Sequence, residues 1–328
     1  CFFEWERLYE NFKDSKFVYS DRNGCPLNYP KIWILISKLF THEKFFYLLL
    51  IVNFILYNYV FYFLIKKHKS LILVYMYMSG SSLLMLERGN LEIFIFILIF
   101  LFLISKSYLK IFFLFSSIVL KIFPIFALIS ILNKKNLYFF ITISFLSLLY
   151  FFIIIEDLAL IFVNTPQTGD MSYGTLAVSI NILKHLNIEI NYLIISFSLI
   201  FIVLLLYFIF FRKFLKNENF MYSEMFLTGA AIFCATFLLN SNHDYRLMFL
   251  LFAVPLIVNI NNFFLKSSII VVLIFSLELN RLLYFFGFYG GVLNSLSKIL
   301  LFILLSQILI NILFLNFKNF FLKKENAL

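Results

Sequence analysis

The segment LLNSNHDYRLMFLLFAVPLI, residues 238–257, shows the pattern that decides the fold of this chain. A short polar stretch, SNHDYR (241–246), stands between two long apolar runs. Charged groups beside hydrocarbon are costly, so they persist where they face a polar surface or a paired site. We therefore predict two membrane helices, 221–240 and 247–263, joined by a polar loop at a membrane face.

The composition of the whole chain repeats this pattern. Of its 328 residues, 63% are hydrophobic, 21% are aromatic and only 13% are charged, whereas soluble domains average about 45–50% apolar and about 25% charged residues. This composition excludes a soluble globular domain and predicts an integral membrane protein. The net charge of +10 comes from 27 Lys and Arg against 17 Asp and Glu. In a membrane protein we assign this excess to cytoplasmic loops, and we expect no nucleic-acid partner.

Motifs for cofactors and metals are missing from the sequence. The three cysteines have no metal-ligand spacing, and there is no CxxC, HExxH, Walker loop or GxGxxG. We therefore expect no cofactor and no bound metal. Cys1 and Cys25 lie in a polar segment and could pair in an oxidising compartment, whereas Cys234 lies in an apolar run.

Apolar runs of about 20 residues predict an all-α, polytopic membrane helix bundle with about nine transmembrane helices and one re-entrant helical hairpin. The predicted membrane helices cover residues 45–65, 71–87, 91–105, 137–155, 193–211, 221–240, 247–263, 268–287 and 293–317. Residues 45–317 would form the bundle. Residues 1–44 are too polar to span and would form an outward loop, and residues 318–328 would form a basic cytoplasmic tail.

The basic loops orient the bundle, because Lys and Arg concentrate in cytoplasmic loops. The Lys-rich loops are KKHK (66–69), KSYLK (106–110), NKKN (133–136) and RKFLK (212–216). The loops poor in Lys, which we assign to the outer face, are LERGN (86–90), residues 156–170, SNHDYR (241–246) and GFYGG (287–291). The outer face therefore collects most of the polar chemistry of the chain.

The run 111–132 breaks this order if it crosses the membrane once, since every later loop would then lie on the wrong side. Lys121 and Pro124 stand in its middle, and proline interrupts a helix by removing one hydrogen bond. We therefore predict that 111–132 enters the membrane and returns. The alternative is that another helix is miscounted, since 91–105 is short for a span.

Two candidate phosphate contacts lie before and within this run. Arg88 and Asn90 precede a helix N-terminus, where free N–H groups and the helix dipole favour an anion. The other reading is a simple helix cap by Asn90. Lys121 lies in an apolar run, which predicts that it is the counter-ion of a buried phosphate. The alternative is a lysine whose side chain extends to the membrane interface.

The loop NHDYR offers a base, an acid and a phosphate clamp in adjacent positions. His243 titrates near neutrality, Asp244 can accept a hydroxyl proton, and Arg246 can bind phosphate. The other reading is an Asp244–Arg246 ion pair with Tyr245 as an interfacial anchor.

The outward segment DRNGCPLNYPKIW (21–33) adds aromatic and amide groups. Asn28 and Tyr29 suit the acceptor side of a sugar site, or else belong to a loop that rests on the membrane.

Taken in order, four segments resemble the integral-membrane transferases of glycosyltransferase family 87, in the GT-C class. They are NYPKIW (28–33), ERGNLEIFIFILIF (87–100), SSIVLKIFPIFALI (116–129) and NHDYRLMFLLFAVPLI (242–257). The resemblance covers about residues 21–257. It implies a GT-C-like helix bundle that moves a sugar from a polyprenyl-phosphate donor to a lipid-linked or cell-envelope glycan acceptor at the outer face.

The resemblance also implies site residues. Arg88, Asn90, Lys121, Tyr245 and Arg246 would contact the donor phosphate, and the acceptor would need a base, by analogy an aspartate in the first outward loop.

The loop aspartates in this chain are Asp14 and Asp21, with His243 and Asp244 as the next candidates. In the family that aspartate closely follows a first membrane helix, and no predicted helix precedes residue 45 here. Since the chain begins at Cys1 rather than Met, we expect residues upstream of it, and the catalytic aspartate could be among them.

We therefore expect a hexosyltransferase such as a mannosyltransferase, in a bacterial inner membrane, with its active site on the extracytoplasmic face. Its expected partners are the polyprenyl-phosphate sugar donor, a glycolipid or glycan acceptor and membrane lipids. Three alternatives stay open: a transporter or flippase for a polar lipid or solute, an O-antigen polymerase or ligase that uses a diphosphate donor, and a membrane scaffold without activity.

Overall fold

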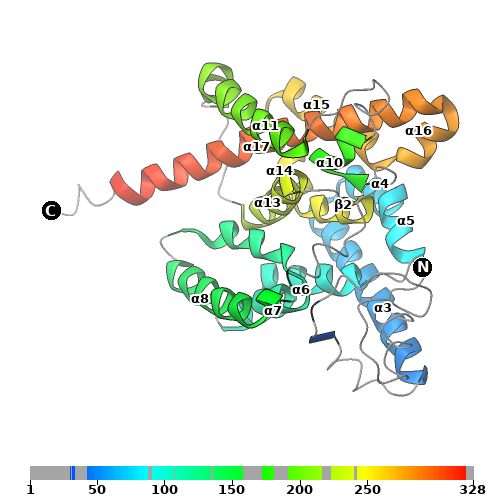
Figure 1. Ribbon diagram of the computed structural model, residues 1–328, viewed down its shortest axis with the longest axis vertical. Coiled ribbons are helices and arrows are strands. Elements are labelled where there is room, and N and C mark those ends of the chain that lie inside the picture. The colour runs from blue at the N-terminus through cyan, green and yellow to red at the C-terminus, as the bar shows by residue number, and fades with distance from the viewer. Residues whose placement is uncertain are drawn as a thin grey trace. The chain divides into compact units, whose positions relative to one another are not determined.

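A computed structural model describes most of the chain and shows an almost entirely helical protein (Figure 1). The residues that it describes are 30, 32–33, 43–87, 91–106, 108–133, 136–156, 158, 172–180, 191–215, 223–239 and 242–322. Within them the strands form one two-stranded sheet of two residues each. The predicted all-α class is confirmed, and the short sheet is a feature that the sequence did not predict. The chain divides into two compact units.

The first unit comprises residues 1–69, 83–128 and 138–166. Its described helices are α3 (Glu43–His68), α6 (Glu92–Ile104), α7 (Tyr108–Leu120), most of the 3-10 helix η1 (Phe123–Ile131) and α8 (Leu137–Ile153). Helix α6 forms the core, because after Glu92 its residues are all apolar and most of the helix is buried. Phe96 of α6 packs against Tyr57 and Phe61 of α3, with ring centroids 5.9 and 6.3 Å away.

The second unit comprises residues 70–82, 129–137 and 167–328. Its described elements are α4 (Leu71–Tyr77), β1 (Ser172–Tyr173), α10 (Thr175–Val178), α11 (Tyr192–Leu206), the π-helical turn η5 (Tyr207–Phe211), α12 (Arg212–Phe214), α13 (Glu224–Leu239), β2 (Asn242–His243), the 3-10 helix η7 (Asp244–Phe252), α14 (Val254–Val258), α15 (Phe263–Leu277), α16 (Leu279–Phe286) and α17 (Phe288–Leu322). Helix α5 (Gly80–Glu87) has residues in both units.

Helix α13 is the core of the second unit. Small residues let the chain after it approach closely: a Cβ atom on Gly229 would lie 2.7 Å from the carbonyl oxygen of Phe249 in η7. On another side, Phe237 stacks on Phe302 of α17 at 4.8 Å. The long helix α17 runs beside α15, α16 and α13 and so forms the axis of this unit.

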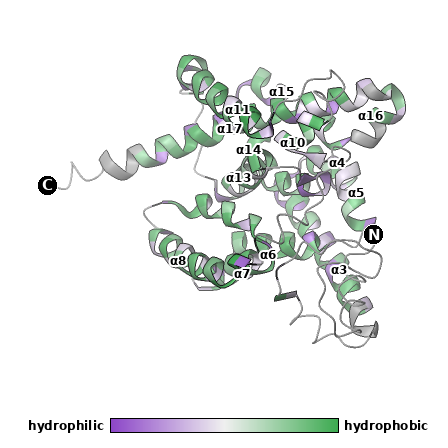
Figure 2. Cartoon of the chain, viewed as in Figure 1, coloured by the Kyte–Doolittle hydropathy of each residue, from purple (hydrophilic) through white to green (hydrophobic). Residues whose placement is uncertain are grey.

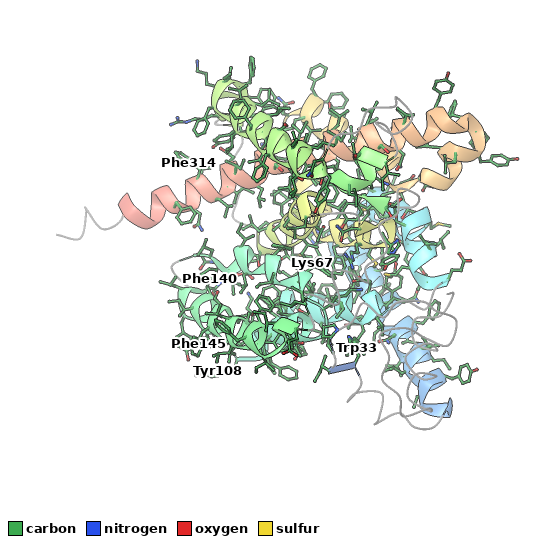
Figure 3. All side chains as sticks on the ribbon, in the orientation of Figure 1. Trp33, Lys67, Tyr108, Phe140, Phe145 and Phe314 are labelled. Carbon is green, nitrogen blue, oxygen red and sulfur yellow. The ribbon has the colours of Figure 1, made fainter. Side chains whose placement is uncertain are left out.

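Three described helices are long and apolar enough to cross a membrane: Tyr47–His68, Tyr192–Phe214 and Tyr289–Phe317. Apolar residues cover almost every helix (Figure 2), and side chains such as Phe145 of α8 are exposed (Figure 3). These features fit a membrane protein. The count of nine spans and the re-entrant hairpin stay predictions.

Several predicted helices are interrupted in the structure. The run 71–87 is divided into α4 and α5, the run 268–287 into α15 and α16, and the run 247–263 into the 3-10 helix η7 and the short α14. The run 111–132 also divides, since α7 ends at Leu120 and η1 begins at Phe123, beside Lys121 and Pro124 as the proline predicted. At the breaks after α7 and α15 a charged residue, Lys121 or Glu278, interrupts the apolar run.

Candidate functional site

The short sheet joins two loops that the sequence assigned to the outer face. Ser172 pairs with His243 and Tyr173 pairs with Asn242 in the antiparallel ladder. Because successive residues of a strand point to opposite sides, the polar segment alternates: Asn242 and Asp244 are buried, and His243 is half-exposed. The ladder therefore divides the NHDYR loop into an inner and an outer face.

The inner face is built on a buried ion pair between Asp244 and Lys298. The Lys298 Nζ atom donates to Asp244 Oδ1 at 2.7 Å and to the carbonyl oxygen of Ser172 at 3.1 Å. Both charged side chains are almost fully buried. One ammonium group thus connects α17, the start of η7 and β1.

Burial and pairing act on the Asp244 carboxyl in opposite directions. Burial raises its pKa, and the adjacent Lys298 ammonium lowers it. Removing either partner would leave the other as an uncompensated buried charge, which is the costly arrangement. Asp244 is therefore held by Lys298 rather than free to move toward a ligand.

Asn242 connects the loop to the end of α13. Its Nδ2 atom donates to the carbonyl oxygen of Thr236 at 2.7 Å, and its Oδ1 atom accepts from Arg246 Nη1. The Thr236 hydroxyl also lies 2.8 Å from the hydroxyl of Tyr173. Side chains of the ladder thus fix both strands to one helix.

The outer face carries His243 and Arg246, which are both half-exposed. The His243 ring stacks on Tyr245, with centroids 5.2 Å apart. The structure therefore pairs Asp244 with Lys298 and places Arg246 on Asn242, which differs from the Asp244–Arg246 pair that the sequence offered as an alternative. An imidazole and a guanidinium are the groups of this segment that a ligand can reach.

A second buried ion pair lies in the first unit. Lys121, predicted as a phosphate counter-ion, contacts Glu92 Oε1 at 2.6 Å, and Glu92 is fully buried in the first turn of α6. The charge of Lys121 is thus balanced inside the chain. This pair stands where α7 ends.

The break after α7 leaves backbone carbonyls that side chains satisfy. Pro124 has no N–H group, so Leu120 lacks its usual helical donor, and the indole nitrogen of Trp33 donates to the Leu120 carbonyl at 2.8 Å instead. The hydroxyl of Tyr150 in α8 donates to the Val119 carbonyl at 2.7 Å. Two side chains from other segments of this unit therefore satisfy carbonyl groups at the break.

The remaining predicted site residues lie outside the described residues: Asp14, Asp21, Asn28, Tyr29, Arg88 and Asn90. The structure brings together His243, Asp244, Tyr245 and Arg246, and adds two partners that sequence reasoning missed, Lys298 and Ser172. Lys298 carried the same signal as Lys121, a single cation in an apolar run. Its position near a predicted helix start hid that signal.

Comparison of the chain with protein-family models, curated proteins and solved structures finds no match. Within the described residues, no group of three or more His, Cys, Asp or Glu is arranged to hold a metal ion. The clearest chemical features of the described residues are the two buried ion pairs and the NHDYR loop, which the Asp244–Lys298 pair holds.

Proposed function

We propose that this chain is a membrane glycosyltransferase that moves a sugar, a hexose such as mannose, from a polyprenyl-phosphate donor to a lipid-linked or cell-envelope glycan. The observation that carries the proposal is the buried Asp244–Lys298 pair, which fixes the NHDYR segment where two loops meet. Buried ion pairs add little net stability, and ionisable groups in apolar bundles mark functional sites by default.

In the proposed reaction the acceptor hydroxyl attacks the anomeric carbon of the donor sugar. The new carbon–oxygen bond forms as the bond to phosphate breaks, and the polyprenyl phosphate leaves with the electron pair. His243 is the proposed base, because a half-exposed imidazole can take the hydroxyl proton near neutral pH. Arg246 is the proposed phosphate contact, since its guanidinium stabilises the charge that develops on the leaving group.

The buried groups have supporting roles in this proposal. Asp244 is a positioning residue, because Lys298 already holds its carboxylate. Tyr245 supports the His243 ring by stacking. The other donor contacts expected from the sequence, Arg88, Asn90 and Lys121, are not assigned to this site, and Lys121 is paired with Glu92 in the first unit. Asn28 and Tyr29 as acceptor contacts, and Asp14 and Asp21 as bases, stay predictions from the sequence alone.

The test measures sugar transfer in membranes that contain the chain. Membranes are incubated with polyprenyl-phosphate donors of radiolabelled mannose, glucose or arabinose, and label is counted in extractable glycolipid. Two variants remove the proposed groups, His243→Ala and Arg246→Ala. Matched controls remove the same side chains elsewhere, His68→Ala at the end of α3 and Arg212→Ala in α12.

We expect transfer from one donor, a loss of about 100-fold or more in His243→Ala, the range that a general base contributes, and a clear loss in Arg246→Ala. The two controls should keep parental transfer. Absence of transfer from every donor by a folded protein, or full transfer by both site variants, would contradict the proposal. A parallel reaction with a diphosphate-linked donor tests the polymerase or ligase alternative, because that class of enzyme uses such a donor.

A transporter or flippase is the second candidate, and polar groups deep in the helices favour it. Besides the Glu92–Lys121 pair, α17 carries buried Gln307, which donates to the Val203 carbonyl at 2.9 Å, and buried Asn311, which accepts from Tyr207 at 3.3 Å. Intramembrane polar groups often mark a transport path. Movement of a fluorescent lipid between leaflets of proteoliposomes, without sugar transfer, would support this function instead.

A further inference from the structure

The hairpin formed by α16 and the start of α17 carries a cluster of exposed aromatic side chains. Tyr284, Phe285 and Phe286 of α16 are 84%, 72% and 59% exposed, and Tyr289 of α17 is 79% exposed. The stretch 282–297 contains no charged residue. An aromatic surface of this kind is costly in water, so another phase or molecule covers it.

The hairpin is built to hold this cluster at its tip. Gly287 reverses the chain with a φ of +54°, in the left-handed region that favours glycine. A Cβ atom on Gly290 would lie 2.1 Å from the carbonyl oxygen of Leu282, so the backbones of α16 and α17 are in direct contact. Helix α16 therefore runs back along the start of α17 (Figure 1).

The length of α17 shows what covers the tip. Its apolar part, Tyr289–Phe317, has 29 residues, which at about 1.5 Å per residue span roughly 43 Å. A bilayer with its headgroup layers is about 40–45 Å thick, and its hydrocarbon core about 30 Å. A helix of this length that crosses the bilayer places Tyr289 in a headgroup layer rather than in hydrocarbon or in bulk water.

Two buried polar groups follow Tyr289 along the same helix, Asn294 and Lys298. Asn294 donates to the carbonyl oxygens of Phe275 and Ser276, which end α15, at 2.6 and 3.2 Å. Lys298, whose ammonium pairs with Asp244 of η7, lies one further turn along α17. Four residues of helix separate Asn294 from Lys298, or about 6 Å. Both polar groups therefore lie on the hydrocarbon side of the aromatic tip, where the pairing of Lys298 with Asp244 compensates the buried charges.

We infer that the α16–α17 hairpin is an interfacial anchor, whose residues Tyr284, Phe285, Phe286 and Tyr289 insert into the headgroup–acyl boundary of a phospholipid leaflet. Aromatic side chains prefer this boundary because their rings are apolar and the Tyr hydroxyl stays hydrated. The anchor would fix the depth of α17 and, through it, the depth of Lys298. This inference does not depend on the proposed sugar transfer.

The test measures depth by electron paramagnetic resonance of a nitroxide label. The label is attached to Phe285→Cys in a full-length chain whose three native cysteines are replaced by serine, reconstituted in phosphatidylcholine–phosphatidylglycerol vesicles. Power saturation compares collisions with lipid-soluble oxygen and with water-soluble nickel–EDDA. Two reference labels define the scale: Phe201→Cys, exposed in the middle of the span of α11, and Lys213→Cys, exposed in α12.

We expect the label at 285 to lie between the two references, with more oxygen than nickel collisions and a depth at the headgroup–acyl boundary. Nickel collisions equal to those at position 213 would place the tip in water and overturn the inference. Low collisions with both reagents would show that protein covers the tip, either a second copy or another partner, and would overturn it as well. A second label at Tyr289→Cys should give the same depth, because it occupies the same tip.

Discussion

At the scale of single residues, a buried ion pair adds little net stability, but removing one partner is strongly destabilising. Lys298→Met is expected to lower the free energy of unfolding by about 3–5 kcal/mol, because Asp244 becomes an unpaired buried charge. The double variant Asp244→Leu, Lys298→Met should recover most of this loss, since it removes both charges. The free energy of unfolding of each variant is measured by detergent unfolding in mixed micelles, with Lys213→Met as the exposed control. Equal losses in the single and double variants would contradict the pairing.

The proline break gives a second prediction at this scale. Trp33→Phe removes the indole donor to the Leu120 carbonyl and should cost about 1–3 kcal/mol, the range for a buried unsatisfied group. Pro124→Ala supplies a backbone N–H that can reach the same carbonyl, so the double variant should be less damaged than Trp33→Phe alone. The same detergent unfolding assay measures this. If the losses in free energy of unfolding were additive in the double variant, the Trp33 indole and the new N–H at position 124 would not be alternative donors to the Leu120 carbonyl.

Features that depend on a single residue were predictable from the sequence. Pro124 interrupts its helix because the missing N–H is a property of that residue alone. The partners were not predictable, since Glu92 meets Lys121, and Asp244 meets Lys298, only after distant segments pack together. A single cation in an apolar run indicates that some partner exists, but its sequence position does not say which.

At the scale of elements, the β1–β2 ladder is the contact that assembles the candidate site. The pair Ser172→Cys and His243→Cys, in a chain whose native cysteines are replaced, should form a disulfide under mild oxidation, because opposed residues of an antiparallel ladder lie within the required Cα distance. The pair Ser172→Cys and Phe286→Cys serves as control. Gel mobility without and with reductant measures it. Equal crosslinking in both pairs would contradict the register.

Element boundaries show why the sequence predicted the apolar runs, and the break at Pro124, but not the other breaks. Helix α15 ends at Leu277, where Asn294 and Ser81 bond the last carbonyls and Tyr75 bonds Glu278. These caps come from other elements, so hydropathy along 268–287 contains no sign of them. The two-residue strands were equally hidden, because so short a ladder has no periodic pattern.

At the scale of the whole molecule, the composition determined the class. An excess of apolar residues predicts a helical membrane protein whatever its internal partners, and the described residues are indeed helical, with three helices able to span. The number of spans, and the side of the membrane on which each loop lies, depend on which helices cross. Hydropathy predicts this least well for the interrupted helices. The side of the membrane on which the proposed site lies is therefore the property to measure first.

The most direct test of the account is whether the NHDYR segment faces outward. Single cysteines at His243 and at Lys213, both accessible in the structure, are treated with a membrane-impermeant maleimide on intact cells, in a chain without native cysteines. The account predicts labelling at position 243 from outside, and labelling at position 213 only after the membrane is opened. Labelling at 213 but not at 243 in intact cells would contradict an extracytoplasmic site.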